Sequence, residues 1–128
     1  MKTVFIVDDN DTNLVTAGKS LDSVYKTYTM LSAEKMFKLL DKITPDLILL
    51  DVEMPEMDGF EALSKLKSSE QLKAIPVAFL TTKNDTETET RGFEMGAVDF
   101  ISKPFSPPVL IKRIETHIGN WERSGVRT

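Results

Sequence analysis

Five side chains that could share one chemical task come at or shortly after the ends of short apolar runs: Asp8, Asp9, Asp51, Thr81 and Lys103. Parallel strands all end at the same edge of a sheet, and ligands bind outside that edge where the strand order reverses. If the apolar runs are such strands, the five side chains meet at one edge. Carboxylates suit hard cations, and Mg²⁺ typically binds one or two of them and keeps several waters. The pattern therefore predicts a magnesium site.

The aspartates need a cation if they lie close together. Neighbouring strands lie about 4.8 Å apart, so Asp8 and Asp9 would crowd against Asp51 if their strands are adjacent. Two carboxylates about 4 Å apart repel by about 4 kcal/mol at an effective dielectric of about 20. Taken singly, the acidic run that begins at Asp8 fits a solvated loop or helix start, Lys103 a surface cation, and Thr81 a hydroxyl in a turn. The joint pattern favours the metal site.

Short apolar runs predict the strands that carry these side chains. Continuous rather than alternating apolarity is typical of parallel strands covered on both faces. Such runs lie at residues 4–7, 47–50, 77–80 and 98–101, and a weaker edge strand is predicted at residues 25–30. An edge strand is expected to carry polar neighbours, as this one does.

Segments with helical spacing separate these strands. The apolar stripes are Leu14, Ala17 and Leu21; Ala33, Met36, Phe37 and Leu40; Phe60, Leu63 and Leu66; and Leu110, Ile111, Ile114 and Ile118, with a further helix predicted over residues 85–95. Ser32 is placed to cap the second helix, and Gly96 to end the fourth in a left-handed conformation. Five alternating strands and helices predict an α/β fold, a doubly wound parallel sheet with helices on both faces.

Composition indicates one globular domain. The 128 residues are 41% hydrophobic and 28% charged, and none is cysteine, which excludes disulfide frameworks and thiolate metal sites. No apolar run approaches the ~20 residues that span a bilayer. The net charge of −4 and the scattered basic residues predict no nucleic-acid surface. We therefore expect a cytoplasmic protein that binds neither membrane nor nucleic acid directly.

Four segments resemble the response-regulator receiver domains of two-component signalling. They are Val7-Asp8-Asp9-Asn10, the stretch PDLILLDVEMPEMDG at residues 45–59, Phe79-Leu80-Thr81, and Lys103-Pro104-Phe105. The resemblance covers residues 2–119 and implies a flavodoxin-like five-stranded sheet of order 2-1-3-4-5. The chain would then consist of a receiver domain at residues 1–120 and, at residues 121–128, a polar tail or the start of a linker to an output domain.

The resemblance implies a role for each acidic residue. Asp51 would be the phosphorylated carboxylate, and Asp8 and Asp9 would bind the metal together with Asp51. A backbone oxygen of Glu53 would complete the protein ligands. Mg²⁺ is the expected cofactor, with Mn²⁺ as a substitute, and it would offset charge on the transferred group while Asp51 attacks in line.

The same resemblance assigns the residues around the phosphoryl group. Thr81 would bond this group and Lys103 would pair with it. Phe100 would be a switch aromatic that turns inward when Thr81 moves, and an ordinary sheet residue is the equal alternative. The Lys103–Pro104 peptide is expected to be cis, which would aim the lysine.

Glu53 and Lys83 lie two residues beyond Asp51 and Thr81, respectively, and by resemblance border the path of the water that hydrolyses the acyl phosphate. An ion pair between them, worth roughly 0.2 to 1 kcal/mol if exposed, would hinder this water and slow dephosphorylation. Two side chains that extend separately into solvent are the equal alternative.

Four other residues have predicted places. Pro55 is expected to fix a turn, and Gly59 to allow a positive φ. His117 is the only histidine. It is predicted at solvent or a helix end rather than as a phosphodonor. Trp121 is predicted to pack at a domain edge or to anchor a partner.

The expected partners follow from the resemblance. A sensor histidine kinase or phosphotransfer protein would supply the phosphoryl group from a phosphohistidine, and an output domain or protein would respond to it. The resemblance also allows a dimer that forms on phosphorylation. Residues 103–110 and the basic helix after them are similar to receivers fused to a cyclic-dinucleotide phosphodiesterase. The chain would be a regulator that catalyses only its own phosphorylation and slow dephosphorylation.

Three other functions fit the residues less well. A haloacid dehalogenase-type phosphatase needs its nucleophile in an Asp-x-Asp motif after the first strand, whereas Asp51 follows the third. A flavodoxin-like electron carrier holds a phosphate in its first loop, where Asp8 and Asp9 would repel one. An unphosphorylated interaction module would not need the complete set of site residues.

Overall fold

The computed structural model describes residues 1–123, and the side chains of residues 1–119. Strands and helices alternate along this stretch. The strands are β1 (Thr3–Val7), β2 (Lys26–Met30), β3 (Leu47–Leu50), β4 (Val77–Thr81) and β5 (Asp99–Ser102). The helices are α1 (Asp11–Leu21), α2 (Ala33–Leu40), α3 (Gly59–Lys67), α4 (Thr86–Glu94) and α5 (Pro107–Arg123).

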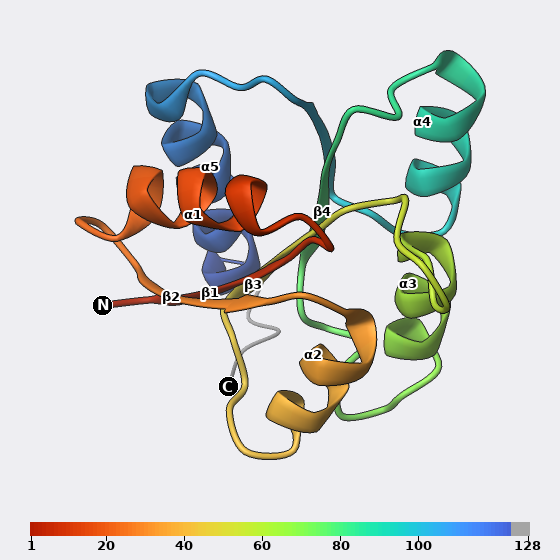
Figure 1. The fold of residues 1–128 in the computed structure, drawn as a ribbon. Helices are drawn as coiled ribbons and strands as arrows, with labels where there is room; N and C mark the ends of the chain where they lie inside the picture. The colour runs from red at the N-terminus through yellow and green to blue at the C-terminus, as the bar shows by residue number, and fades with distance from the viewer. Residues whose placement is uncertain (124–128) are drawn as a thin grey trace.

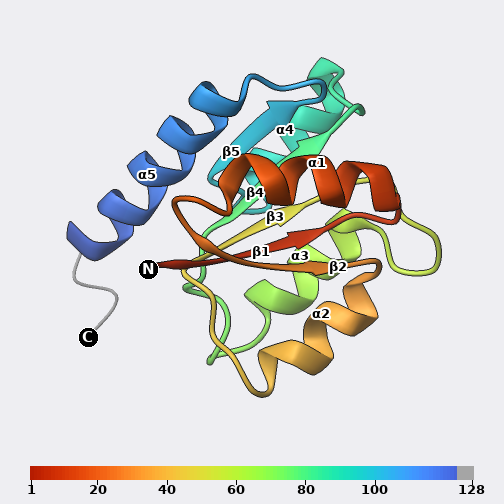
Figure 2. The same cartoon turned by 60° about the vertical axis from the view of Figure 1, so that its left-hand side comes forward.

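All five strands are parallel and form one sheet in the order β2-β1-β3-β4-β5 (Figure 1 and Figure 2), which confirms the predicted fold. The strand order reverses between β1 and β3, because the chain passes from β1 outward to β2 and then crosses back to β3. α1 and α5 cover one face of the sheet, and α2 and α3 cover the other (Figure 2). α4 lies on this second face, where Gly92 approaches the rings of Phe79 and Phe100.

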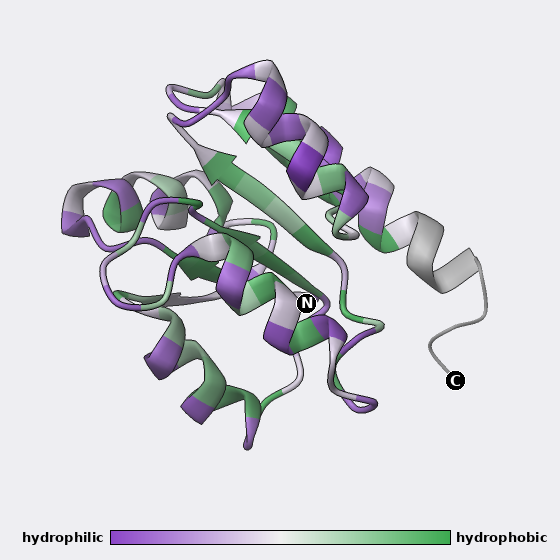
Figure 3. Ribbon diagram, turned by 90° about the vertical axis from the view of Figure 1, so that its right-hand side faces the viewer, coloured by the Kyte–Doolittle hydropathy of each residue, from purple (hydrophilic) through white to green (hydrophobic). Residues whose placement is uncertain are grey.

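Alternate residues of the central strands fill a separate core on each face of the sheet. In β3, Leu47 and Leu49 pack with α1 and α5, whereas Ile48 and Leu50 pack with α2 and α3. All four side chains are fully buried, as the continuous apolar run predicts. Figure 3 shows the hydrophobic strands enclosed by helices whose outer surfaces are more hydrophilic. No helix in the described part of the chain is long and apolar enough to cross a bilayer.

The predicted boundaries differ from the observed ones by a few residues. β2 begins at Lys26 rather than at residue 25, because the Tyr25 N–H donates to the Leu21 carbonyl at the end of α1 (2.9 Å). α5 continues to Arg123, so the first residues of the predicted tail are helical. Trp121 lies within α5, and its side chain is outside the described residues, as are residues 124–128.

Helix ends follow the predicted capping residues. The Ser32 hydroxyl accepts a hydrogen bond from the Lys35 N–H at the start of α2 (3.2 Å). Gly96 has a φ of 105° after the end of α4, which confirms the left-handed terminus. α4 itself buries only Thr88 and Gly92, and its other residues are polar except the exposed Phe93. Among α1 to α4, this helix therefore contributes the fewest buried residues.

Candidate functional site

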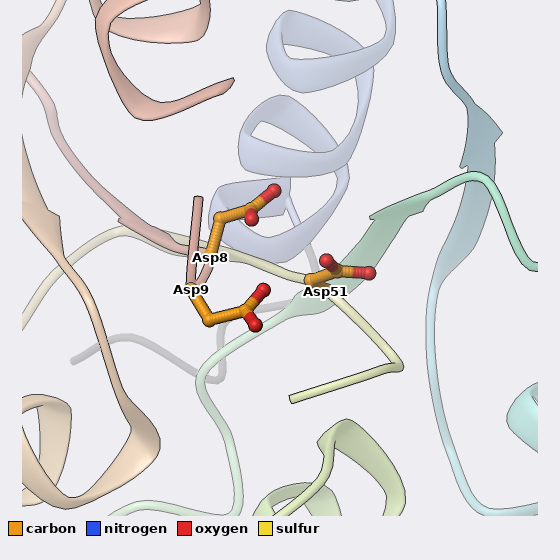
Figure 4. A group of neighbouring side chains, drawn as sticks. All are labelled: Asp8, Asp9 and Asp51. Carbon is orange, nitrogen blue, oxygen red and sulfur yellow. The ribbon is translucent and has the colours of Figure 1, made fainter. Parts of the chain in front are cut away.

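The carboxyl ends of β1 and β3 bring the predicted acidic residues together (Figure 4). Val7 and Leu50 are register partners, so the residues that follow them are neighbours across the sheet. The Asp51 N–H donates to the Val7 carbonyl at 3.0 Å, which extends the ladder to the aspartate itself. Strand pairing therefore fixes the backbone of this carboxylate.

Asp8, Asp9 and Asp51 each offer an oxygen, and these atoms lie within 4.8 Å of one another. Asp8 and Asp51 are buried, whereas Asp9 is exposed. Three carboxylate oxygens at this spacing fit a hard divalent cation, which would relieve their mutual repulsion. The geometry matches the predicted acidic metal site, and Mg²⁺ suits this donor set.

The Lys103 ammonium lies between two of these carboxylates. Its Nζ is 2.6 Å from Asp8 Oδ2 and 3.5 Å from Asp51 Oδ2, and only 9% of the side chain is exposed. The Lys103 N–H donates to the Thr81 carbonyl (3.0 Å), which joins the end of β5 to that of β4. The Lys103–Pro104 peptide is cis, as expected.

The Asp51 carboxyl has a raised pKa, chiefly because burial disfavours its charged form. Hydrogen bonding to the Thr81 hydroxyl and the charge of Lys103 lower the pKa, and the nearby Asp8 carboxylate raises it again. Burial therefore outweighs the partners. An ionised Asp51 is under-solvated in the absence of a bound cation, and a buried carboxylate with a perturbed pKa is a candidate for a functional role.

Thr81 closes the other side of the site at the end of β4. The residue is fully buried, and its Oγ1 accepts a hydrogen bond from the Lys83 N–H at 3.1 Å. The same hydroxyl contacts the Asp51 carboxylate. The predicted position of Thr81 beside Asp51 is therefore confirmed.

The loop after Asp51 folds back onto the site. The Glu53 N–H donates to Asp51 Oδ1 at 3.4 Å, and the Gly59 N–H donates to the Val52 carbonyl at 2.7 Å. The predicted positive φ at Gly59 is wrong: the residue with a positive φ in this loop is Glu56, at 67°. Gly59 is needed for close approach instead, because a Cβ there would lie 2.3 Å from the Asp51 carbonyl oxygen. The backbone oxygen of Glu53 as a metal ligand stays a prediction.

Phe100 lies behind the site on β5. It is 7% exposed, and its ring packs against Phe79 at a centroid distance of 5.5 Å and against Phe93 at 6.4 Å. The ring therefore already points inward in this structure, which is the orientation predicted for the switched state.

A hollow of about 560 Å³ opens beside the acidic cluster. Glu53 and Lys83 both line it, but the predicted ion pair between them is wrong for this structure. Lys83 Nζ instead lies 3.9 Å from Asp85 Oδ1, because Asp85 caps α4 only two residues away. Among the described residues, Lys83 has no ion pair with Glu53.

Sequence reasoning missed two further residues that line this hollow. The Arg91 guanidinium lies over the Phe60 ring at 4.1 Å from the centroid. These residues belong to α4 and α3, and no spacing along the chain indicates that an arginine of one helix meets a ring of the other.

His117 has a different place from the one predicted. Its Nε2 lies 3.0 Å from Asp99 Oδ2 on β5, and Asp99 also pairs with Arg113 at 2.8 Å. The imidazole is 20% exposed and lies mid-helix, so neither free solvent nor a helix end describes it. Helical spacing places His117 one turn after Arg113, but the acidic partner on β5 is a tertiary feature. His117 is far in the fold from the acidic cluster and takes no part in it.

A family model described as the response regulator receiver domain matches residues 4–115. The chain is 40% identical over 118 residues to a "Probable cyclic di-GMP phosphodiesterase" of Vibrio cholerae, with 92% of this chain and 27% of that protein aligned. It is 36% identical to the "Polar-differentiation response regulator DivK" of Brucella ovis, with 93% of this chain and 98% of that protein aligned. The chain thus spans about a quarter of the first relative.

Solved structures share the fold as well. The chemotaxis protein CheY4 of Vibrio cholerae superposes with a TM-score of 0.85 at 31% identity, covering 91% of this chain and 98% of that one. A signal receiver domain of a signal transduction histidine kinase from Syntrophus aciditrophicus gives a TM-score of 0.84 at 33% identity, covering 94% and 92%.

We expect Asp51→Asn to stabilise the fold at pH 7 when no divalent cation is present. Because burial raises the pKa of Asp51, the folded state holds a proton that the unfolded state releases above the ordinary pKa of 3.8. Stability is therefore lost as the pH rises from 3.8 through the raised pKa. The uncharged amide avoids this loss. Urea unfolding in EDTA should show a gain of roughly 1 kcal/mol.

The gain should shrink as the pH falls below 3.8, because the wild-type carboxyl then becomes protonated in the unfolded state as well as in the folded state. Glu70→Gln makes the same charge change at a side chain that is 88% exposed, and should stay within about 0.5 kcal/mol of the wild type. A variant at Asp51 that is less stable than the wild type at pH 7 would contradict the expected cost of the buried charge.

Proposed function

Because the chain belongs to the response regulator receiver domain family, whose members are phosphorylation-activated signalling switches, we propose that Asp51 is its phosphoacceptor. The phosphoryl group would come from the phosphohistidine of a histidine kinase or a phosphotransfer protein, in a reaction that depends on Mg²⁺. Receiver domains in general take their input from histidine kinases and pass it to an output partner. For this chain, a phosphohistidine donor and an output partner are therefore proposed as classes of protein, and no individual kinase or output protein is assigned.

One observation supports the choice of Asp51 more than any other. The Lys103 ammonium lies 3.5 Å from Asp51 and 2.6 Å from Asp8, at the open end of the central strands. A cation held in this place is ready to neutralise a group that arrives on Asp51 with negative charge. The buried Thr81 hydroxyl offers a hydrogen bond from the other side.

Each residue of the site would have its own role in the phosphoryl transfer. An Asp51 carboxylate oxygen attacks the phosphorus, the bond from phosphorus to the donor imidazole nitrogen breaks, and its electron pair returns to the nitrogen. Asp8, Asp9 and Asp51, with the Glu53 backbone oxygen, would hold Mg²⁺, or Mn²⁺ in its place. The bound ion supplies charge stabilisation to the phosphoryl oxygens. Lys103 and Thr81 hold the transferred group once it is on Asp51.

This proposal makes the chain a regulator, not an enzyme for a separate substrate. It would catalyse only its own phosphorylation and the slow loss of the phosphoryl group. The first relative is named a phosphodiesterase, but this chain aligns with 27% of it, so that activity is not carried over. A fused output domain, a separate output protein and a phosphorylation-dependent dimer are all ways to transmit the signal. The cytoplasmic location and the absence of direct nucleic-acid or membrane binding stay predictions.

We expect acetyl phosphate with Mg²⁺ to add one phosphoryl group to the wild type. Asp51→Asn should abolish the addition because the nucleophilic oxygen is lost, and EDTA should stop it because the unrelieved carboxylate cluster repels an anionic donor. Intact-mass spectrometry measures the adduct. Glu70→Gln should be labelled like the wild type. If Asp51→Asn is labelled as readily as the wild type, the acceptor is a different residue.

We expect phosphorylation to change the face formed by α4 and β5. Thr81 would be drawn toward the phosphoryl group, and the pre-existing equilibrium would shift further toward the state in which the Phe100 ring points inward, as it does in this structure. NMR spectra with and without beryllofluoride and Mg²⁺ test this, with Asp51→Asn as the control that should not respond. The expected shifts reach Phe100 and Phe93. Chemical-shift changes confined to the loop after Asp51 would show that Phe100 takes no part in the conformational change.

We expect Glu53 and Lys83 to tune the lifetime of the phosphoryl group separately, since they line one hollow without pairing. Glu53→Ala and Lys83→Ala should each speed hydrolysis by about twofold, and the double variant should show additive free energies to within about 0.5 kcal/mol. A decay time course by intact mass measures the rates, with Lys112→Ala as a remote control. Unchanged lifetimes in both single variants would show that neither residue tunes the lifetime. A clear departure from additivity in the double variant would indicate that Glu53 and Lys83 do pair in the phosphorylated protein.

A further inference from the structure

Arg91 presents an unused guanidinium beside the candidate phosphoacceptor site. The side chain is exposed on α4, and its guanidinium is held over the Phe60 ring at 4.1 Å from the centroid. Within the part of the chain that the structure describes, no carboxylate lies within ion-pair distance of it. A guanidinium that stacks through its face keeps its N–H donors available at the edge of the plane.

The hollow that Arg91 lines opens onto the acidic cluster. Asp9 and Glu53 belong to the same hollow, and Asp9 offers an oxygen within 4.8 Å of those of Asp8 and Asp51. Lys83, the other cation that lines the hollow, lies 3.9 Å from Asp85. Arg91 is thus the cation in this hollow that has no ion pair with another described residue. Arg91 therefore lines the same hollow as Asp9, whose carboxylate belongs to the cluster that contains Asp51.

We propose that Arg91 binds the carboxylate that leaves when a small acyl phosphate phosphorylates Asp51. In this reaction an Asp51 oxygen bonds to phosphorus, the bond between phosphorus and the acyl oxygen breaks, and its electron pair leaves with the carboxylate. No proton is transferred, and a total charge of −3 is kept on both sides for acetyl phosphate. Charge grows on the acyl oxygens as the bond breaks, and an arginine fork matches two carboxylate oxygens. Arg91 thereby makes the chain selective for acyl phosphates among small donors.

Phe60 acts as the support for this contact. The ring is buried on α3 and packs edge-on against Phe79 at 5.4 Å, so its position is fixed by the core. A flexible arginine on the polar helix α4 is thereby held on one side of the hollow. Lysine lacks both the planar face and the fork, so it cannot replace this arginine fully.

The inference rests on the proposed phosphorylation of Asp51, and its test separates the two. Rates of phosphorylation are measured by intact mass with Mg²⁺ and either acetyl phosphate or phosphoramidate, over a range of donor concentrations. Phosphoramidate transfers the same group but releases ammonia, which has no carboxylate. Arg91→Gln should lower the apparent second-order rate constant with acetyl phosphate by about tenfold, the size expected for a lost hydrogen bond between charged groups. The rate with phosphoramidate should change by less than about twofold.

Three further variants sharpen the result. Arg91→Lys should recover only part of the acetyl phosphate rate, and Phe60→Leu should lower it by about threefold through loss of the ring. Lys112→Gln removes a positive charge from α5, outside the hollow, and should leave both rates unchanged. Thermal unfolding of each variant reports damage to the fold.

Each outcome decides between the proposals. If the wild type is labelled by neither donor, the proposed function fails. If it is labelled by both but Arg91→Gln leaves the acetyl phosphate rate unchanged, only the role of Arg91 fails. If Arg91→Gln slows both donors equally, the residue acts on what the two donors share, the anionic phosphoryl group, or on the fold, and the selectivity for acyl phosphates is refuted. A selective loss with acetyl phosphate supports the inference.

Discussion

Carboxylate repulsion at the ends of β1 and β3 is the constraint on which the rest of the structure depends. Three aspartates that offer oxygens within 4.8 Å of one another would push the strand ends apart if nothing opposed them. The Lys103 ammonium supplies one opposing charge from the end of β5, and strand pairing holds the backbone in place. The remaining excess of negative charge leaves a site that favours a divalent cation and, with it, an anionic group. The carboxylate cluster therefore lowers the stability of the folded state at the same place where it favours a cation.

The two buried cores around the sheet offset the repulsion between these carboxylates. Each face of the sheet has its own core, and the central strands β1, β3 and β4 are almost completely buried. Gly59 allows the loop after β3 to close against the Asp51 backbone, where a larger residue would collide. The acidic side chains thus stand on rigid strand ends. The residues around them sit in loops and on α4, which are easier to move.

The fold and the centre of the site could be predicted from the sequence because their signals are local. Continuous apolar runs such as that at Leu47–Leu50 reveal buried parallel strands, and the residue after each run must lie at the sheet edge. The contacts that were missed depend on tertiary packing. Arg91 meets Phe60 across two helices, Lys83 turns to Asp85, and His117 reaches Asp99. The role of Gly59 was also misjudged, because close approach to Asp51 is not visible in a turn motif.

The thin burial of α4 has a consequence for cooperativity. Only Thr88 and Gly92 of this helix are buried, so α4 itself contributes few buried side chains to the core. Its amide hydrogens should exchange through a local opening that costs far less free energy than global unfolding, while those of β1 and β3 exchange only when the whole domain opens. If Asp51 is the phosphoacceptor, a small free energy released there would be sufficient to redistribute the conformations of α4 without disturbing the two cores.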